Sequence, residues 1–297
     1  MGPLQEVGNQ QGVWSVTADN LKRSLDRARR TIFILSALGA LLAAIASQVP
    51  LNTPRFCLAI SGALLLAVVS FLTGRLMGSE HIMAWVRARA ASEGLKREAF
   101  KFAAWAAPYD DAPNRAQRLN EERERIERDV DDLIDQAVAA APGRTPTTDI
   151  TPDEYVQTRV RRQVTDFYEP RAETCRRAAI RLRRLEFGLS LAATIVTGIV
   201  AVAGKDPIGI GFDFIALTAV LTTLAGAVLA HIEASRYEFL VTNYRATARR
   251  LRNELANALE TPAAPSVEWS AFVTRCETIM SEENSNWIAK WSKPAGK

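Results

Sequence analysis

The sequence lacks the patterns that mark common enzymes and metal sites. It contains no Gly-rich phosphate loop, no HExxH and no GxSxG motif, and only two histidines, His81 and His231. An acid–base pair of these imidazoles with Glu80 and Glu233 is conceivable, but isolated charged groups beside an apolar segment are usually anchors. We therefore expect no catalytic residue, no metal and no cofactor.

Cysteine and strand patterns are scarce as well. Cys57, Cys175 and Cys276 are far apart in the sequence, so their spacing fits neither a disulfide framework nor a metal site. We interpret them as reduced thiols that fill space. No alternating apolar and polar run is bounded by turn residues, which predicts an all-helical protein.

Charge is absent from four long apolar blocks. None contains Lys or Arg, and the one acid, Asp213, lies at an edge; the blocks are residues 31–48, 56–74, 187–204 and 212–230. Each comes close to the roughly 20 residues that a helix needs to cross a bilayer. Buried helices of a soluble core are the alternative, but such helices usually keep a polar stripe. We predict an all-α integral membrane protein with four transmembrane helices as two tandem hairpins and long cytoplasmic helices.

The basic residues predict the orientation of these spans. Of the 37 Lys and Arg, only Arg55 and Lys205 lie in the short loops 49–55 and 205–211. The positive-inside rule then places both termini and the middle segment in the cytoplasm. Arginines next to the spans favour anionic lipid headgroups as partners, and we expect no binding to nucleic acid.

The chain contains an internal similarity. Residues 21–106 and 177–262 align without gaps at an offset of 156, which pairs Leu95 with Leu251 and Glu98 with Glu254. Both copies enter the membrane from one side, so the pattern predicts a parallel repeat. Two unrelated hairpins, each followed by a basic helix, would also look somewhat alike.

The pattern predicts five segments. Residues 1–20 are Gly- and Gln-rich without periodicity, which indicates a disordered tail. A first hairpin repeat (21–112) precedes a charged helix over 113–140 and a linker, which together form segment 113–152. The second repeat covers 153–261. Thr151 just before it is the expected N-cap of its first helix, and Pro170 within it is the expected site of a kink. A last helix occupies segment 262–297.

Small and hydroxylated residues recur every four positions within the spans. The candidate residues on the third and fourth spans are Ser190, Thr194, Gly198, Thr218, Thr222, Thr223 and Gly226. Such rows suit close helix packing, and they also suit the wall of a water-filled pore. The absence of a charged residue near any midplane argues against a proton-coupled transporter.

The arrangement of helix, two-span hairpin and long helix, present twice, resembles the SLATT group, the SMODS and SLOG associating two-TM effector domains. The resemblance also rests on the C-terminal stretch 269–291, in which five residues fall in the pattern of that group: Glu277, Glu283, Asn284, Trp287 and Trp291. It implies tandem copies of a bacterial inner-membrane effector, associated with nucleotide-signalling defence systems and proposed to form a pore. It implies no catalytic residues, and sensing would need a partner protein or a site among the cytoplasmic helices.

The sequence leaves three alternative functions to be tested. The first is a homo-oligomeric channel or pore-forming effector, since several chains around an axis can enclose a path that four slim spans cannot. The second is a membrane-anchored helical scaffold that recruits partners without conduction. The third is a small-solute transporter, which predicts a midplane cavity within each chain.

Overall fold

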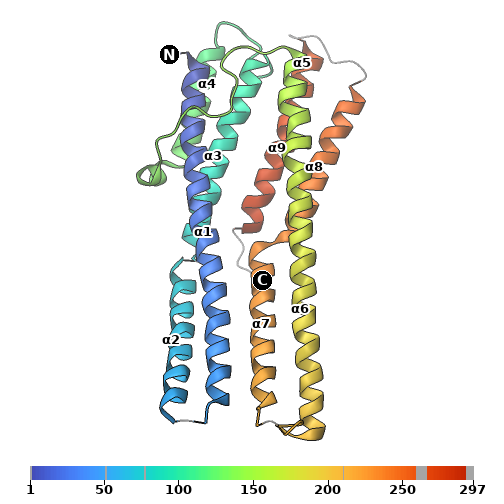
Figure 1. Cartoon of the computed structure of the whole chain (residues 1–297). Coiled ribbons are helices and arrows are strands. Elements are labelled where there is room, and N and C mark those ends of the chain that lie inside the picture. Colours follow the sequence, from blue (N-terminus) through green and yellow to red (C-terminus); the bar gives the residue numbers. More distant parts are fainter. Residues whose placement is uncertain (1, 51, 77, 210, 259–265, 292–297) are drawn as a thin grey trace. The chain divides into compact units, whose positions relative to one another are not determined.

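The computed structural model describes residues 2–50, 52–76, 78–209, 211–258 and 266–291, and for 284–291 it describes the backbone alone. Every regular element in these ranges is a helix, as the sequence predicts (Figure 1). The elements are α1 (Pro3–Gln48), α2 (Asn52–Leu76), α3 (Ser79–Ala103), α4 (Arg115–Arg128), η1 (Asp131–Gln136), α5 (Pro152–Tyr155), η2 (Val156–Arg161), η3 (Gln163–Tyr168), α6 (Glu169–Ala203), α7 (Phe214–Ser235), α8 (Tyr237–Asn257) and α9 (Val267–Trp291).

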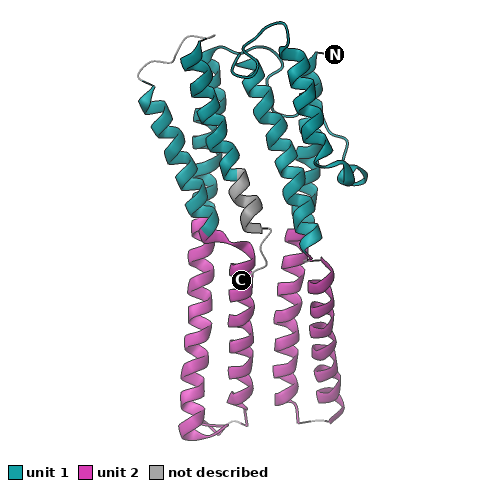
Figure 2. Cartoon of the chain, turned by 180° about the vertical axis from the view of Figure 1, so that it is seen from behind, with its two compact units in different colours: residues 1–24, 79–174, 239–297 teal, residues 25–78, 175–238 magenta. Residues whose placement is uncertain are grey.

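The chain forms two compact units, coloured separately in Figure 2. Unit 1 contains residues 1–24, 79–174 and 239–297, and unit 2 contains residues 25–78 and 175–238. Each predicted hairpin repeat contributes to both units, because its apolar spans lie in unit 2 and its charged helices lie in unit 1. The units therefore separate the chain by chemistry rather than by sequence order.

Unit 2 consists of four helical segments that are long and apolar enough to cross a membrane, and they coincide with the four predicted spans. Large apolar side chains cover their outer surface: Leu64 is 61% exposed and Ile195 54% exposed. Such a surface is unfavourable in water and favourable in hydrocarbon. The prediction of four transmembrane helices is confirmed by the length and composition of these helices.

Two contacts hold unit 2 together. α1 and α2 meet closely at Gly39 and Gly62, where a Cβ on Gly62 would lie 3.1 Å from the carbonyl oxygen of Gly39. The side-chain amide of Gln48 donates to the carbonyl oxygen of Asp213 at 2.9 Å and accepts from the Asp213 N–H at 2.8 Å. The first contact joins the two spans of a hairpin, and the second joins the two hairpins.

The prediction of a disordered tail over residues 1–20 is wrong for most of that segment. α1 begins at Pro3, and its N-terminal part packs into unit 1. A stripe with alternating spacings of three and four residues is buried there: Leu4, Val7, Gln11, Trp14 and Ala18. The stripe is difficult to recognise in the sequence for two reasons. The segment is rich in Gly and Gln, and the stripe itself contains one Gln and few strongly apolar residues.

The helices that follow the second and fourth spans are separated from these spans by a break. α2 ends at Leu76 and α3 begins at Ser79, while α7 ends at a left-handed Arg236 with φ 50°. Such a residue closes a helix much as a C-terminal glycine does. The two breaks lie at similar places in the two repeats, because an offset of 156 maps 78 onto 234.

The predicted helix over 113–140 is shorter in the structure. α4 ends at Arg128, and a 3₁₀ turn follows over Asp131–Gln136. Leu119, Ile126 and Leu133 follow one another at spacings of seven residues and form a buried apolar stripe, but Ile134 is 63% exposed. The change from α to 3₁₀ geometry rotates the later residues off the stripe.

The start of the second repeat agrees with its sequence signal. Thr151 accepts a hydrogen bond from the Glu154 N–H, and the Glu154 carboxylate accepts one from the Thr151 N–H at 2.8 Å. This reciprocal capping box opens a helix with Pro152 at its first position. The helix is π-type over 156–161 and 163–168, and it returns to α geometry at Glu169, next to the Pro170 where we expected a kink.

Candidate functional site

Helix α3 is the centre of unit 1, where it packs against α4 and α9. Its buried face includes Leu95 and Ala99, and α9 places Trp269 and Phe272 in the same core. The Trp269 indole N–H donates to the carbonyl oxygen of Ala104 at 2.6 Å, which fixes the start of α9 against the end of α3. This frame positions the charged side chains described next.

A buried ion pair joins α9 to the helix that leads into the third span. Arg159 donates from Nε and Nη2 to the two carboxylate oxygens of Glu277, at 2.9 and 2.8 Å. The Tyr155 hydroxyl donates to the same carboxylate at 3.0 Å. Both charged side chains are at most 3% exposed, so each compensates the charge of the other in a dry environment.

A second buried carboxylate organises the end of α3. Glu98 accepts a hydrogen bond from the Tyr109 hydroxyl at 2.8 Å and from Arg97 Nε at 2.6 Å. Burial and the adjacent Glu98 charge raise the pKa of Tyr109 above its ordinary value. The phenol therefore stays a hydrogen-bond donor at any physiological pH.

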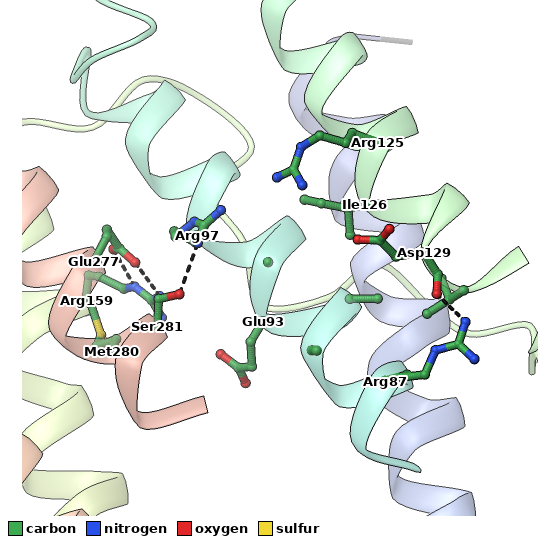
Figure 3. A pocket seen from close by; sticks show the side chains of 14 residues that line it. Arg87, Glu93, Arg97, Arg125, Ile126, Asp129, Arg159, Glu277, Met280 and Ser281 are labelled. Atoms are coloured by element: carbon green, nitrogen blue, oxygen red, sulfur yellow. Dashed lines mark hydrogen bonds and ion pairs between the residues drawn. The ribbon is translucent and has the colours of Figure 1, made fainter. Parts of the chain in front are cut away.

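Between these clusters lies a pocket of about 470 Å³, with walls formed by α3, α4 and α9 and by Arg159 (Figure 3). Four arginines line it, Arg87, Arg97, Arg125 and Arg159, together with the carboxylates of Glu93, Asp129 and Glu277. Arg97 spans from α3 to α9 by donating to the Ser281 hydroxyl at 3.0 Å. The charged groups of the pocket thus carry a small excess of positive charge.

Glu93 stays ionised at the wall of this pocket. Burial alone would raise the pKa of its carboxyl, but the charges of Lys96, Arg89 and Arg159 outweigh burial and lower the pKa. The pocket therefore presents both signs of charge to a bound molecule. Alternating charges of this kind select a ligand by its pattern of donors and acceptors rather than by net charge alone.

The structure places the candidate residues of the spans on unit 2. The hydroxyls of Thr194, Thr218, Thr222 and Thr223 all donate to the backbone carbonyl four residues earlier in their own helix. Ser190 Oγ contacts the Glu186 carboxylate at 3.2 Å. The side chains of Thr194, Thr222 and Thr223 are exposed, and no atom lies within 4 Å of a Cβ built on Gly198 or Gly226.

Two of the five residues in the C-terminal pattern are buried and paired. Glu277 binds Arg159 and Tyr155, and Glu283 lies 3.9 Å from Arg89 Nη2 and 3.4 Å from Asn243 Nδ2. The side chains of Asn284, Trp287 and Trp291 lie outside the described residues. The described part of the pattern therefore anchors α9 to α3, to α8 and to the segment before α6.

Sequence reasoning did not single out Arg159, Arg97 or the pocket. Tyr155 and Arg159 are four residues apart, which would place them on one face of a helix, and this spacing was the available signal. Their partner Glu277 lies more than one hundred positions later in the sequence, at a separation that no local pattern reveals.

Four apolar helical segments and a separate, highly charged helical unit define a multi-pass membrane protein. Residues 155–287 match the family model of the SMODS and SLOG-associating 2TM effector domain 1, in agreement with the resemblance seen in the sequence. Residues 12–117 match the model of a second family, described as a protein of unknown function (DUF4231). No curated protein and no solved structure matches the chain.

The two matches divide the chain as the internal similarity does, since each covers one pair of spans and the helix that follows it. Because the two halves match different family models, the duplication of one domain stays a prediction. What the family match shows is the likeness of the second half of the chain to a domain described as a two-span effector domain.

Proposed function

We propose that the chain is a homo-oligomeric channel or pore-forming effector of the bacterial inner membrane, with unit 1 and both termini in the cytoplasm. Effector is the word that the family description applies to residues 155–287. A role in a nucleotide-signalling defence system, with a nucleotide-sensing partner protein, follows from the same association. Anionic headgroups next to the basic flanks complete the set of partners.

The observation that carries the proposal is the exposed row of Thr222 and Gly226 on α7. Its residues are weakly polar, and among the described residues none outside its own helix backbone lies within 4 Å of a Cβ built on Gly226. Small residues let helices of different chains approach closely, and hydroxyls bonded to their own backbone still offer lone pairs to water. This surface suits an interface or a pore wall formed by several copies.

Planar bilayer recording on the purified protein tests conduction. We expect discrete currents that Thr222→Phe abolishes, because a phenyl ring on that row would fill a path between copies. Thr73→Phe is the matched control, since Thr73 is also exposed on a span and bonded to the carbonyl four residues earlier. Equal currents from both variants would contradict a path along α7.

A non-conducting scaffold is the second candidate. The hydroxyls of Thr194, Thr218, Thr222 and Thr223 are satisfied within their own helices, so these helices can also lie dry in lipid. Native mass spectrometry separates the two functions. A monomer that gives no current at any voltage would favour the scaffold, whereas a defined oligomer with current supports the pore.

A further inference from the structure

Arg159 lines the pocket, its guanidinium carbon lies 4.6 Å from the centroid of the Phe100 ring, and one of its hydrogen-bond donors is unused. Two of its guanidinium nitrogens bind Glu277, but Nη1 is buried and has no hydrogen-bond partner among the described residues. A buried donor without an acceptor lowers the stability of the folded state, and it does so more strongly when it is charged. Such atoms are rare in folded proteins, so this one points to an acceptor that binds from outside the chain.

Further donors surround the same opening. Arg97 lies near Arg159 and reaches toward α9, where the Ser281 hydroxyl is its partner (Figure 3). A smaller pocket of about 240 Å³ shares Arg97 and Ser281 and adds Lys101. The two pockets therefore share the Arg97–Ser281 pair, and the smaller one also contains the carboxylates of Glu277 and Glu282.

The geometry favours a tetrahedral anion over a planar one. Arg159 approaches from the segment before α6, Arg97 from α3 and Ser281 from α9, so the donors come from three elements. Phosphate oxygens point in several directions and accept from such donors together, while a carboxylate accepts best from a fork in its own plane. Guanidinium groups are the usual partners of phosphate in proteins.

The remaining walls indicate a molecule larger than a bare ion. The apolar side chains of Ile126, Val130 and Met280 line the pocket, and the ionised Glu93 offers an acceptor for a donor group. The volume of about 470 Å³ lies in the range of small-molecule sites. A ligand with an anionic group, a hydrogen-bond donor and an apolar part could therefore contact the arginines, Glu93 and the apolar side chains of the pocket.

We propose that this pocket binds a small phosphorylated molecule, whose phosphate accepts hydrogen bonds from Arg159 Nη1 and Arg97. The inference goes beyond the proposed function, because binding at this pocket can be measured without any current. Failure to bind would leave the pore untouched, and failure to conduct would leave the pocket untouched.

Isothermal titration of the full chain with pyrophosphate tests the site, in nanodiscs that contain phosphatidylcholine as the only lipid. We expect saturable binding that Arg97→Gln weakens at least tenfold. Arg159→Lys should weaken it similarly, because lysine keeps a positive charge beside Glu277 but has no second nitrogen for the phosphate. Arg250→Gln is the matched control and should bind like the wild type, since Arg250 is a partly exposed arginine paired with Glu282 and does not line the pocket.

The result that overturns the proposal is equally concrete. No heat at millimolar pyrophosphate, or binding that survives both Arg97→Gln and Arg159→Lys, would show that Nη1 is satisfied otherwise, for example by rotation of Glu93. If Arg159→Lys does not fold, as judged by circular dichroism, Arg97→Gln alone decides, because Arg97 is partly exposed and outside the buried pair.

A second arm identifies the source of the phosphate. The wild type and Arg97→Gln are melted in phosphatidylglycerol and in phosphatidylcholine nanodiscs without soluble phosphate. A soluble ligand predicts that the difference in melting temperature between the two lipids is the same for the wild type and for Arg97→Gln, together with pyrophosphate binding by the wild type. A higher melting temperature in phosphatidylglycerol, lost in Arg97→Gln, would assign the phosphate to a lipid headgroup instead.

Discussion

Leu64 of unit 2 and Ile134 of unit 1 are almost equally exposed, at 61% and 63%, yet their surroundings differ. Leu64 lies near the middle of a helix with a mean hydropathy of 2.4 over its most apolar window, among other exposed apolar residues. Ile134 lies in a short 3₁₀ turn that contains three aspartates. Exposure alone therefore says little, and the neighbouring residues reveal whether lipid or water is the solvent.

Polar groups show the same contrast between the units. In unit 1, carboxylates such as Glu98 and Glu277 are buried and paired with partners from distant parts of the sequence. In unit 2, threonine hydroxyls are bonded within their own helices. Unit 1 thus gains its specific packing from long-range polar pairs, whereas each span satisfies its polar groups locally, as hydrocarbon requires.

Breaking the buried pair should have the largest effect. Arg159→Met leaves the Glu277 charge buried without compensation, which costs about 3–5 kcal/mol. We expect a large fall in the thermal midpoint, measured by the near-ultraviolet circular dichroism of the tryptophans, among them Trp14, Trp85, Trp105 and Trp269 of unit 1. The double variant Arg159→Met with Glu277→Leu should recover much of the loss, and an unchanged midpoint in the single variant would contradict the pair.

An arginine introduced at Leu64 or at Ile134, two almost equally exposed positions, distinguishes a surface in lipid from a surface in water. Leu64→Arg should reduce membrane integration, at a cost of about 2.5–3.5 kcal/mol for arginine at the centre of a span. Ile134→Arg should change stability by less than about 0.5 kcal/mol, since the site faces water. The yield of each variant in the membrane fraction is the measurement, and equal yields would show that lipid does not surround Leu64.

Removing a hydroxyl from a span should have a smaller effect on folding. Thr222→Val deletes a bond of the side chain to its own helix and should change stability by less than about 1 kcal/mol. The thermal midpoint in detergent checks this expectation. A large loss would mean that Thr222 has a partner outside its own helix, such as a second copy of the chain.

The cysteines test the orientation without changing stability. A membrane-impermeant maleimide applied to spheroplasts should label Cys57, because it lies at the end of its span next to the short loop 49–55, and Cys57→Ser should abolish this labelling. Cys276 should stay unlabelled in the folded protein, because it is buried and its pKa is raised above the ordinary value of 9.0 by burial and by Glu277. Labelling of Cys57 only in inside-out vesicles would reverse the predicted orientation.

The spans could be predicted from the sequence because composition alone determines which segments hydrocarbon accepts. Helix starts were also readable where the signal is local, as at Thr151 and Glu154. The helix at Pro3–Ala18 was missed, since its burial depends on a partner surface rather than on its own composition. Arg159 was missed for a related reason: its significance comes from Glu277, and that pairing exists only in the folded chain.

The side chain of Gln48 binds main-chain atoms of Asp213, so this contact does not depend on which side chain stands at position 213. Its amide donates to the carbonyl and accepts from the N–H of residue 213, as an adjacent β-strand would. A substitution at position 213 can therefore leave both hydrogen bonds intact, whereas Gln48→Glu removes the amide donor and with it one of the two hydrogen bonds. Across related chains, we therefore expect position 48 to tolerate fewer substitutions than position 213, to which it binds.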